Sequence, residues 1–467
     1  MIEGLARWID RRVAGSGWAE KKLKKIFPES WAHLFGEIAL YSFVVLVLTG
    51  TFLALFFDGS HTKTHYLGEY QPLNGVEVSS AYASTVKLSF DVPGGLLFRQ
   101  MHHWAALIFT AAIVVHLCRV FFTGAFRRPR EMNWMIGVTL LILAIIEGFA
   151  GYSLPDDLLS GTGLRIGYAI FESIPLIGTW LASFIFGGTF PGEHLLTRLY
   201  MLHIFLLPTL FFALIGLHLA LVFRQTHTQF PGEGRREDNV VGLPLWPTYT
   251  ALSFAMFFIV SGVIAGLGGL FQINPVWFYG PYDPYVVSIG SQPDWYMGWL
   301  EGSLRLMPPW EFRGLGYMIP NPFLPAVLLP ALTFLGLYAY PFIERRLTKD
   351  TAEHHLLDRP RDRPVRSAFG AAMLTFYGVL TIAGSSDLLA YELRVPVSGL
   401  VVFLRGATII APVLVYFLTY NWCRGLAVAK ERPPGMEWYE EEPREEEPEA
   451  ETATAEHEPA TASESAS

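Results

Sequence analysis

The stretch from Arg99 to Arg119 constrains the fold most strongly, because it is long and apolar and carries a histidine towards each end. His102 and His116 are fourteen residues apart, and almost every residue between them is apolar. Fourteen helical residues rise roughly 21 Å at about 1.5 Å per residue, and steps of about 100° return the second histidine to nearly the same face. One membrane-spanning helix would therefore hold two imidazoles on one side, near opposite ends of a bilayer core about 30 Å thick.

A second apolar stretch repeats this arrangement a hundred residues later. His203 and His218 are fifteen residues apart, which turns the second histidine by about 100° more than a spacing of fourteen would. Pro208 lies between them and can kink the helix to absorb that turn. A single histidine in an apolar helix is more often a packing residue than a ligand. Two pairs at nearly equal spacing favour four axial ligands for two haems.

Four glycines repeat the same spacing in two other apolar stretches. Gly36 and Gly50 are fourteen residues apart, and so are Gly137 and Gly151. Glycine lets another group approach a helix backbone closely, so this repeat predicts contacts with the haems. Ordinary packing of small residues between helices is the alternative explanation for each glycine taken alone.

Two arginines flank the first pair of histidines. Arg99 and Arg119 each lie three residues outside a proposed ligand, where a cation can bind a haem propionate. For Arg119 an anchoring role on the basic side of the membrane is an equal alternative.

The composition places the chain in a membrane. Of 467 residues 52% are hydrophobic, and the mean hydropathy of +0.34 is too high for a soluble protein of this length. The two cysteines, Cys118 and Cys423, form no Cys-x-x-Cys-His motif, so they predict neither a c-type haem nor a four-thiolate iron–sulfur cluster. Electrons carried by this chain would have to leave to another subunit.

Eight apolar runs are long enough to cross a bilayer. They lie near 36–57, 102–123, 134–153, 200–223, 248–271, 323–343, 368–388 and 398–422. The sequence thus predicts an all-α integral membrane protein with about eight transmembrane helices, the first four forming a dihaem four-helix bundle. We divide the chain into an amphipathic segment at 1–33, a dihaem domain at 34–235, a C-terminal domain at 236–428 with a long loop at 272–320, and a disordered acidic tail at 429–467.

The distribution of basic residues predicts the orientation in the membrane. Lysines and arginines concentrate in the N-terminal segment and in alternate loops, including the cluster from Arg345 to Arg366. By the positive-inside rule these loops and both termini are cytoplasmic. His102 and His203 would then lie near the outer face, and His116 and His218 near the inner face.

The long loop at 272–320 contains the sequence Pro-Asp-Trp-Tyr at 293–296. Pro293 suits the first turn of a short helix, which would place Asp294 and Glu301, seven residues apart, on one face. A carboxylate at the apolar outer border is placed to accept a proton from a quinol hydroxyl. The alternative is a helix N-terminal charge on a solvated loop.

Together these motifs resemble cytochrome b of the quinol:cytochrome c reductase complexes. The sequences Gly-Tyr-Ser-Leu-Pro-Asp-Asp at 151–157 and His-Thr-Gln-Phe-Pro-Gly at 227–232 resemble the actinobacterial branch, whose complexes oxidise menaquinol. The resemblance covers roughly residues 20–425. It implies an enzyme subunit that oxidises quinol at an outer site and translocates protons. One electron would pass to a Rieske iron–sulfur partner, and the other would cross through two b haems to an inner quinone site.

The resemblance also assigns roles to individual residues. The ligands of a low-potential haem would be His102 and His203, and those of a high-potential haem His116 and His218. Further residues would complete the haem and quinol sites, namely the propionate partners Arg99 and Arg119, the catalytic Asp294 and Tyr296, and the quinol-pocket residues Gly163, Pro293 and Trp295.

Partners and location follow from the same resemblance. They are a Rieske subunit, a cytochrome c subunit for which two haems are one option, a terminal oxidase supercomplex as a further option, a second copy in a homodimer, and the lipid of a bacterial cell membrane. Nucleic acid is not expected. The chain would cross the membrane several times with both termini in the cytoplasm.

The sequence departs from the usual pattern in ways that leave some roles open. Asp294 stands where the family usually has a longer Glu, so Glu301 is a second candidate for the proton acceptor. For the inner quinone site Arg224 and His227 are only the nearest candidates. Two other classes of membrane protein also contain paired histidines. A dihaem anchor of another respiratory oxidoreductase would lack Pro-Asp-Trp-Tyr, and a transporter with a histidine relay would not need glycines at haem spacing.

Overall fold

A computed structural model describes residues 8, 22–28, 30–286, 290–314 and 316–430. Eight of its helices are long and apolar enough to span a membrane, which confirms the predicted fold class. Their bounds are His33–Ala54, Gly95–Phe122, Glu131–Tyr152, Leu195–Gln225, Leu245–Leu270, Leu324–Thr348, Pro364–Gly384 and Val397–Ala427. The predicted amphipathic segment at 1–33 lies largely outside the described residues, and the acidic tail almost wholly so.

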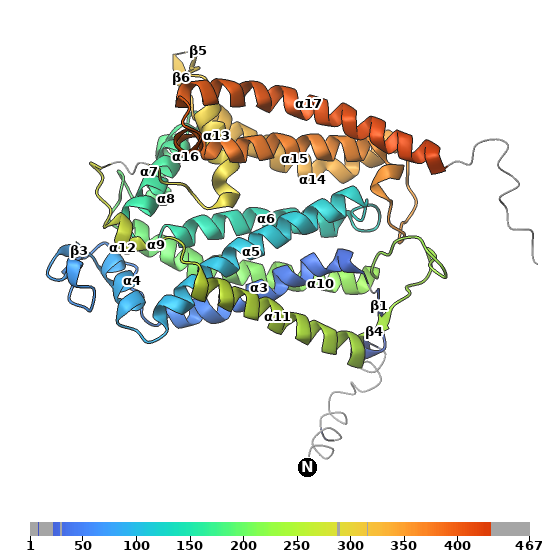
Figure 1. Ribbon diagram of the computed structural model, residues 1–467, viewed down its shortest axis with the longest axis horizontal. Coiled ribbons are helices and arrows are strands. Elements are labelled where there is room, and N and C mark those ends of the chain that lie inside the picture. The colour runs from blue at the N-terminus through green and yellow to red at the C-terminus, as the bar shows by residue number, and fades with distance from the viewer. Residues whose placement is uncertain (1–7, 9–21, 29, 287–289, 315, 431–467) are drawn as a thin grey trace, which may run out of the picture.

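Figure 1 names the elements that form these spans and the segments between them. The spanning elements are α3 (Trp31–Ala54), α5 (Gly95–Phe122), α6 (Glu131–Tyr152), α9 (Leu195–Met201) with α10 (Leu207–Gln225), α11 (Thr250–Leu270), α14 (Leu329–Thr348), α15 (Pro364–Gly384) and α17 (Val397–Lys430). The shorter helices are α4 (Ser80–Phe90), α7 (Leu158–Glu172), α8 (Gly178–Phe186), α12 (Val276–Tyr279), α13 (Gly298–Leu306) and α16 (Ser386–Leu393). Antiparallel strand pairs join β1 (Ile26–Phe27) to β4 (Leu243–Pro244), β2 (Lys63–His65) to β3 (Glu77–Ser79), and β5 (Phe312–Gly314) to β6 (Tyr317–Ile319).

The helices α3, α5, α6 and α10 share one apolar core. Phe43, Phe109, Leu140 and Phe211 are buried members of this core, and each comes from a different one of the four helices. Large aromatic side chains contribute strongly to such packing. Helix α11 packs against α3 and α5, whereas α13, α15 and α17 form a second group beside α6 and α14 (Figure 1).

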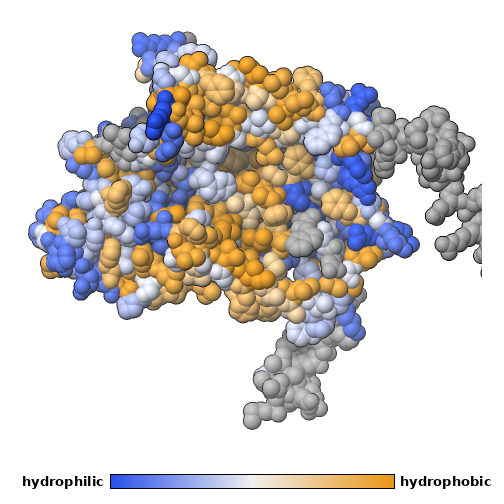
Figure 2. Space-filling view, in the orientation of Figure 1, coloured by the Kyte–Doolittle hydropathy of each residue, from blue (hydrophilic) through white to orange (hydrophobic). Residues whose placement is uncertain are grey.

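The outer surface of the bundle suits a lipid environment. Figure 2 shows a broad apolar band over the lengths of the helices, with hydrophilic residues at both ends. Phe258 and Phe403 are each 68% exposed on this surface. Apolar patches of this size on a protein indicate contact with a membrane or a partner, and the span lengths favour the membrane.

The helix that carries His203 and His218 contains a local change of helix type. Residues Leu202–Leu206 form a π-helical segment (η2) between α9 and α10, directly before Pro208. A π-bulge accommodates one extra residue within an α-helix. We attribute the fifteen-residue spacing to this insertion, since it offsets the additional turn of about 100°. The irregularity expected at Pro208 therefore lies in the turn before the proline, where the π-helical segment Leu202–Leu206 takes up the extra residue.

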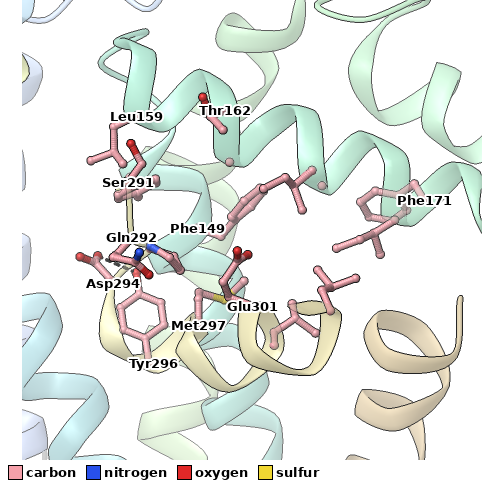
Figure 3. Close-up of a pocket in the computed structure, with 18 residues that line it drawn as sticks. Phe149, Leu159, Thr162, Phe171, Ser291, Gln292, Asp294, Tyr296, Met297 and Glu301 are labelled. Atoms are coloured by element: carbon pink, nitrogen blue, oxygen red, sulfur yellow. Dashed lines mark hydrogen bonds between the residues drawn. The ribbon is translucent and has the colours of Figure 1, made fainter. Parts of the chain in front are cut away.

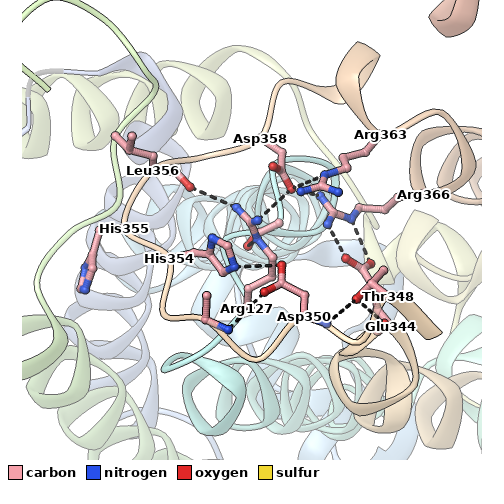
Figure 4. A network of polar contacts seen from close by, with 12 residues as sticks. Arg127, Glu344, Thr348, Asp350, His354, His355, Leu356, Asp358, Arg363 and Arg366 are labelled. Atoms are coloured by element: carbon pink, nitrogen blue, oxygen red, sulfur yellow. Dashed lines mark hydrogen bonds and ion pairs between the residues drawn. The ribbon is translucent and has the colours of Figure 1, made fainter. Parts of the chain in front are cut away.

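Arginines and carboxylates connect the loops at the His116 end of the bundle. Asp358 forms ion pairs with Arg127 at 3.3 Å, Arg363 at 3.2 Å and Arg366 at 2.7 Å (Figure 4). Arg366 also forms an ion pair with Glu344. Arg366 is only 5% exposed, and a buried guanidinium requires such compensation. The network ties the loop between α5 and α6 to the loop between α14 and α15.

Candidate functional site

The four predicted ligands meet as two pairs inside the helical bundle. The ring centroids of His102 and His203 are 6.1 Å apart, with an angle of 81° between the rings. Those of His116 and His218 are 6.5 Å apart, with an angle of 75°. A metal–nitrogen bond of about 2.0–2.1 Å to each imidazole, with each centroid about 1.1 Å further away, gives a separation of about 6.3 Å. Both pairs therefore fit one iron atom between them.

Each predicted glycine lies against one of these histidines. A Cβ atom built on Gly151 would lie 2.4 Å from Cε1 of His203, and one on Gly50 would lie 3.0 Å from Cε1 of His102. The same atoms on Gly36 and Gly137 would lie 3.1 Å and 3.8 Å from Cε1 of His116 and His218, respectively. Gly36, Gly50 and Gly151 thus make room for the imidazole rings, a more specific role than the general haem contact that the spacing predicted, whereas the distance at Gly137 is an ordinary contact.

The two pairs differ in what holds the second ring nitrogen. Nδ1 of His102 lies 2.9 Å from the Thr49 hydroxyl, and Nδ1 of His203 lies 3.1 Å from Oε1 of Glu147. Nδ1 of His116 and of His218 has no hydrogen-bond partner within the described part of the chain. Sequence reasoning missed Thr49 and Glu147. Thr49 directly precedes Gly50 and Glu147 lies four residues before Gly151, but neither position gave a distinct signal.

Both predicted propionate partners are buried and incompletely hydrogen-bonded. Arg99 donates from Nη1 to the carbonyl of Asn274 at 3.2 Å, while its Nε and Nη2 have no partner among the described residues. Arg119 contacts His33 at 3.3 Å through Nη2 and leaves its Nε unpaired in the same sense. Buried donors need acceptors, so both arginines suit the anionic groups of a haem.

A cavity of about 220 Å³ lies at the end of the bundle that carries His102. It is bounded by the last turns of α6, by α7, and by the segment 291–304, which includes most of α13 (Figure 3). Five residues predicted for the quinol site line it, namely Gly163, Pro293, Asp294, Tyr296 and Glu301. Trp295 does not line this cavity and is 41% exposed. It lies in the 3₁₀ turn at Trp295–Met297.

The helix expected to begin at Pro293 is divided into two elements. Asp294 precedes a 3₁₀ turn at Trp295–Met297, and α13 begins only at Gly298. Asp294 and Glu301 therefore do not share a helical face. In Figure 3 Glu301 points into the middle of the cavity, whereas Asp294 lies at its end beside Tyr296.

Asp294 is hydrogen-bonded by two neighbouring side chains. Nε2 of His103 lies 2.9 Å from Oδ1 and 3.0 Å from Oδ2, and Tyr296 donates its hydroxyl to Oδ2 at 3.1 Å. Burial and the Asp294 charge raise the pKa of Tyr296 well above its ordinary value, so the phenol remains a donor. His103 was missed, although it directly follows the ligand His102 in the sequence.

Glu301 is held by a different set of partners. Nε of Arg305 donates to Oε1 of Glu301 at 2.8 Å, and Nη1 of the same arginine binds Asp387 at 2.6 Å. The charge of Glu301 is thus balanced within α13, one turn away along the helix. The carboxylate of Asp294, in contrast, is hydrogen-bonded by His103 and Tyr296.

The inner-site candidates separate into one clustered and one exposed residue. The ring of His227 lies 4.3 Å from that of Phe27 and 5.7 Å from that of His33. Burial, followed by the charge of Lys25, lowers the pKa of His227 to about 4. Arg224 is exposed and stands apart from this cluster.

The fold and the two facing histidine pairs define a class of membrane protein whose helical bundle is suited to hold two haems. A family profile described as "Cytochrome b(N-terminal)/b6/petB" matches residues 107–281. The "Cytochrome bc1 complex cytochrome b subunit" of Mycobacterium leprae is 56% identical over 419 residues, which are 90% of this chain and 76% of that protein. The protein of the same name from Streptomyces coelicolor is 49% identical over 425 residues, or 91% and 78%.

A solved structure described as "Hyperthermophilic respiratory Complex III" has a similar fold, with a TM-score of 0.66 and 22% sequence identity over 89% of this chain and 100% of that one. The relatives from Mycobacterium leprae and Streptomyces coelicolor are 56% and 49% identical to this chain over most of both sequences, which establishes the family. The chain belongs to the cytochrome b subunits of cytochrome bc1 complexes, the quinol:cytochrome c reductases. The resemblance seen in the motifs, including that to the actinobacterial branch, is confirmed.

Proposed function

We propose that this subunit binds two non-covalent b-type haems, the low-potential one between His102 and His203 and the high-potential one between His116 and His218. The observation that carries the proposal is the pair of centroid separations, 6.1 and 6.5 Å. When bound, the haems supply one-electron transfer across the membrane to an inner quinone, while the second electron of each quinol leaves to a Rieske partner. Gly36, Gly50 and Gly151 provide room for the ligand rings, Gly137 lies beside the ring of His218, and Arg99 and Arg119 bind the propionates.

The cavity at the His102 end is the proposed site of quinol oxidation, with menaquinol as the substrate class. Its walls are largely apolar, with Asp294 and Glu301 as its lining carboxylates, which suits a quinone ring. Asp294 accepts the proton of a quinol hydroxyl. Tyr296 holds the carboxylate by its hydrogen bond of 3.1 Å. Glu301 is the second candidate acceptor, less favoured because Arg305 already binds it.

The distribution of basic residues supports the proposed orientation of the chain in the membrane. The arginine-rich network around Asp358 lies at the His116 end, and basic loops favour the cytoplasmic side. The His102 end would therefore face outwards, and both termini inwards. The proposed partners are a Rieske subunit, a cytochrome c subunit with one or two haems, a terminal oxidase and a second copy of this chain. The domain division at residue 235 belongs to the same proposal.

A pyridine-haemochrome count combined with a redox titration of the purified protein tests this function. Two b haems per chain with two separate midpoint potentials are expected. One haem or none would contradict the four-ligand assignment. Family membership leaves no support for the transporter with a histidine relay or for the anchor of an unrelated oxidoreductase.

A further inference from the structure

Glu147 is a partly buried carboxylate, 20% exposed, that the proposed mechanism does not use. It lies on α6, one turn before Gly151, and its Oε1 is 3.1 Å from Nδ1 of His203. The backbone carbonyl of the same residue lies 3.2 Å from the same nitrogen. Two acceptors from one residue therefore converge on the imidazole that is proposed to hold the haem at the His102 end.

The environment of Glu147 indicates a role connected with that imidazole. His203 is its only ion-pair partner among the described residues, and its Oε2 is buried without a hydrogen-bond partner there. A carboxylate inside a membrane protein is costly unless a positive charge compensates it. No arginine or lysine of the described chain forms an ion pair with it, so His203 is the group through which a positive charge can reach this carboxylate.

We propose that Glu147 is a positioning residue that lowers the midpoint potential of the haem held by His102 and His203. This inference rests on the proposed two-haem function. With a haem iron held at Nε2 of His203, Nδ1 would keep its proton and donate a hydrogen bond to Glu147, whose backbone carbonyl lies at 3.2 Å and whose Oε1 lies at 3.1 Å. A carboxylate acceptor makes the imidazole a stronger electron donor and stabilises the more positively charged, oxidised state.

The pair formed by His116 and His218 has no such carboxylate within the described part of the chain. Nδ1 of His116 and Nδ1 of His218 have no hydrogen-bond partner in the described chain, and no carboxylate forms an ion pair with either ring there. The remaining ligand, His102, has the neutral hydroxyl of Thr49. Glu147 therefore accounts physically for a difference in potential between two otherwise similar bis-histidine sites.

The test is a redox titration of the Glu147→Gln variant in the assembled protein with both haems. Gln keeps the size of the side chain and leaves the backbone acceptor in place. The midpoint potential of the haem at the His102 end is expected to rise by at least about 59 mV, which corresponds to a tenfold change in its one-electron reduction equilibrium. The other midpoint should stay unchanged.

Glu131→Gln is the matched control, because Glu131 begins the same helix and pairs with Arg345 at 3.3 Å rather than with a ligand. It should shift neither midpoint. If the wild-type protein lacks two haems, the proposed function fails. If it has two and Glu147→Gln shifts neither midpoint, or shifts both equally, only the role of Glu147 is refuted.

A second variant, Glu147→Asp, keeps the role of Glu147 testable if Glu147→Gln loses a haem. Glu147→Asp keeps the charge and should retain the haem with a midpoint nearer to that of the wild type than to that of the other haem. A midpoint as high as that of the other haem would overturn the inference. Loss of this haem from both variants would also overturn it, because the carboxylate would then be required for assembly rather than for the potential.

Discussion

His103 and Asp294 are joined by hydrogen bonds of 2.9 and 3.0 Å from Nε2 to the two carboxylate oxygens. His103 follows the ligand His102 on α5, whereas Asp294 lies in the long loop almost two hundred residues later. The contact fixes the loop carboxylate beside the helix that carries a proposed haem ligand. This contact connects the proposed proton acceptor of the quinol to the helix that carries a ligand of its proposed electron acceptor.

Asp294→Asn is expected to keep both haems and lose most quinol oxidation. The amide cannot accept a proton at neutral pH, and a general base typically contributes about 10²–10⁴-fold. Asn can still interact with His103 and Tyr296, so the local structure should persist. Turnover with menaquinol in the assembled complex is the measurement, with the haem spectrum as the control for folding. Turnover near the wild-type value would show that Asp294 is not the essential base.

Glu301→Gln should reduce turnover much less than Asp294→Asn does. Arg305 donates to Glu301 at 2.8 Å, and this arginine would keep its second partner, Asp387 at 2.6 Å, when Glu301 is neutralised. We expect a loss of less than about tenfold, below the range typical of a general base. The two variants are compared in the same turnover assay. A larger loss in Glu301→Gln would reverse the assignment of the proton acceptor.

The membrane spans could be predicted because their signal is local. An apolar run of sufficient length specifies a spanning helix wherever it occurs, and the predicted run at 134–153 matches the helix Glu131–Tyr152 to within a few residues. The facing of His102 and His116 also follows from helical periodicity alone. The π-helical segment at Leu202–Leu206 could not be derived, since only the neighbouring Pro208 indicated an irregularity.

The partners of the site residues required the tertiary structure. His103 reaches Asp294 across a sequence separation of 191 residues, and Glu147 reaches His203 across 56. Nothing in a single sequence distinguishes such contacts from other polar residues near apolar runs. The predicted shared helical face of Asp294 and Glu301 was wrong for a local reason, because the 3₁₀ turn at Trp295–Met297 changes the helical phase between them.

Arg366→Leu is expected to destabilise the protein by about 3–5 kcal/mol, the usual effect of breaking a buried ion pair. The substitution would leave Glu344 without its arginine, and Arg366 is only 5% exposed. Arg236→Leu is the control, because Arg236 is 73% exposed and its ion pair with Asp238 should contribute little to stability. Thermal unfolding in detergent compares the two. Equal effects would contradict a structural role for the network around Asp358.

Gly151→Ala should lose or loosen the haem at His102 and His203, whereas Gly137→Ala should keep both haems. The new Cβ would lie 2.4 Å from Cε1 of His203 in the first variant but 3.8 Å from Cε1 of His218 in the second. The first distance forces the ring or the helix to move, and the second is an ordinary contact. A haemochrome count with a redox titration distinguishes them. Two haems with unchanged midpoints in Gly151→Ala would contradict the close packing of ring on helix.

The stability of the protein should depend on pH through Asp157, which caps α7 by accepting the backbone N–H of Ser160 at 3.1 Å. Burial raises the pKa of Asp157 to about 6, although the hydrogen bonds from Ser160 and the charge of Arg99 oppose the shift. The unfolded chain has a carboxyl pKa of about 3.9. The folded state therefore holds the proton more tightly, and this contribution to stability is present below pH 4 and lost as the pH rises through 6.

Asp157→Asn removes this dependence, because Asn is neutral at every pH and also caps helices well. Relative to the wild type, the variant should gain up to about 3 kcal/mol in unfolding free energy between pH 4 and pH 7, at 1.36 kcal/mol per pKa unit. Unfolding in detergent at a series of pH values measures the difference. A constant difference between wild type and Asp157→Asn across this range would mean that Asp157 is ionised in the folded protein, held by Arg99 more strongly than burial opposes it.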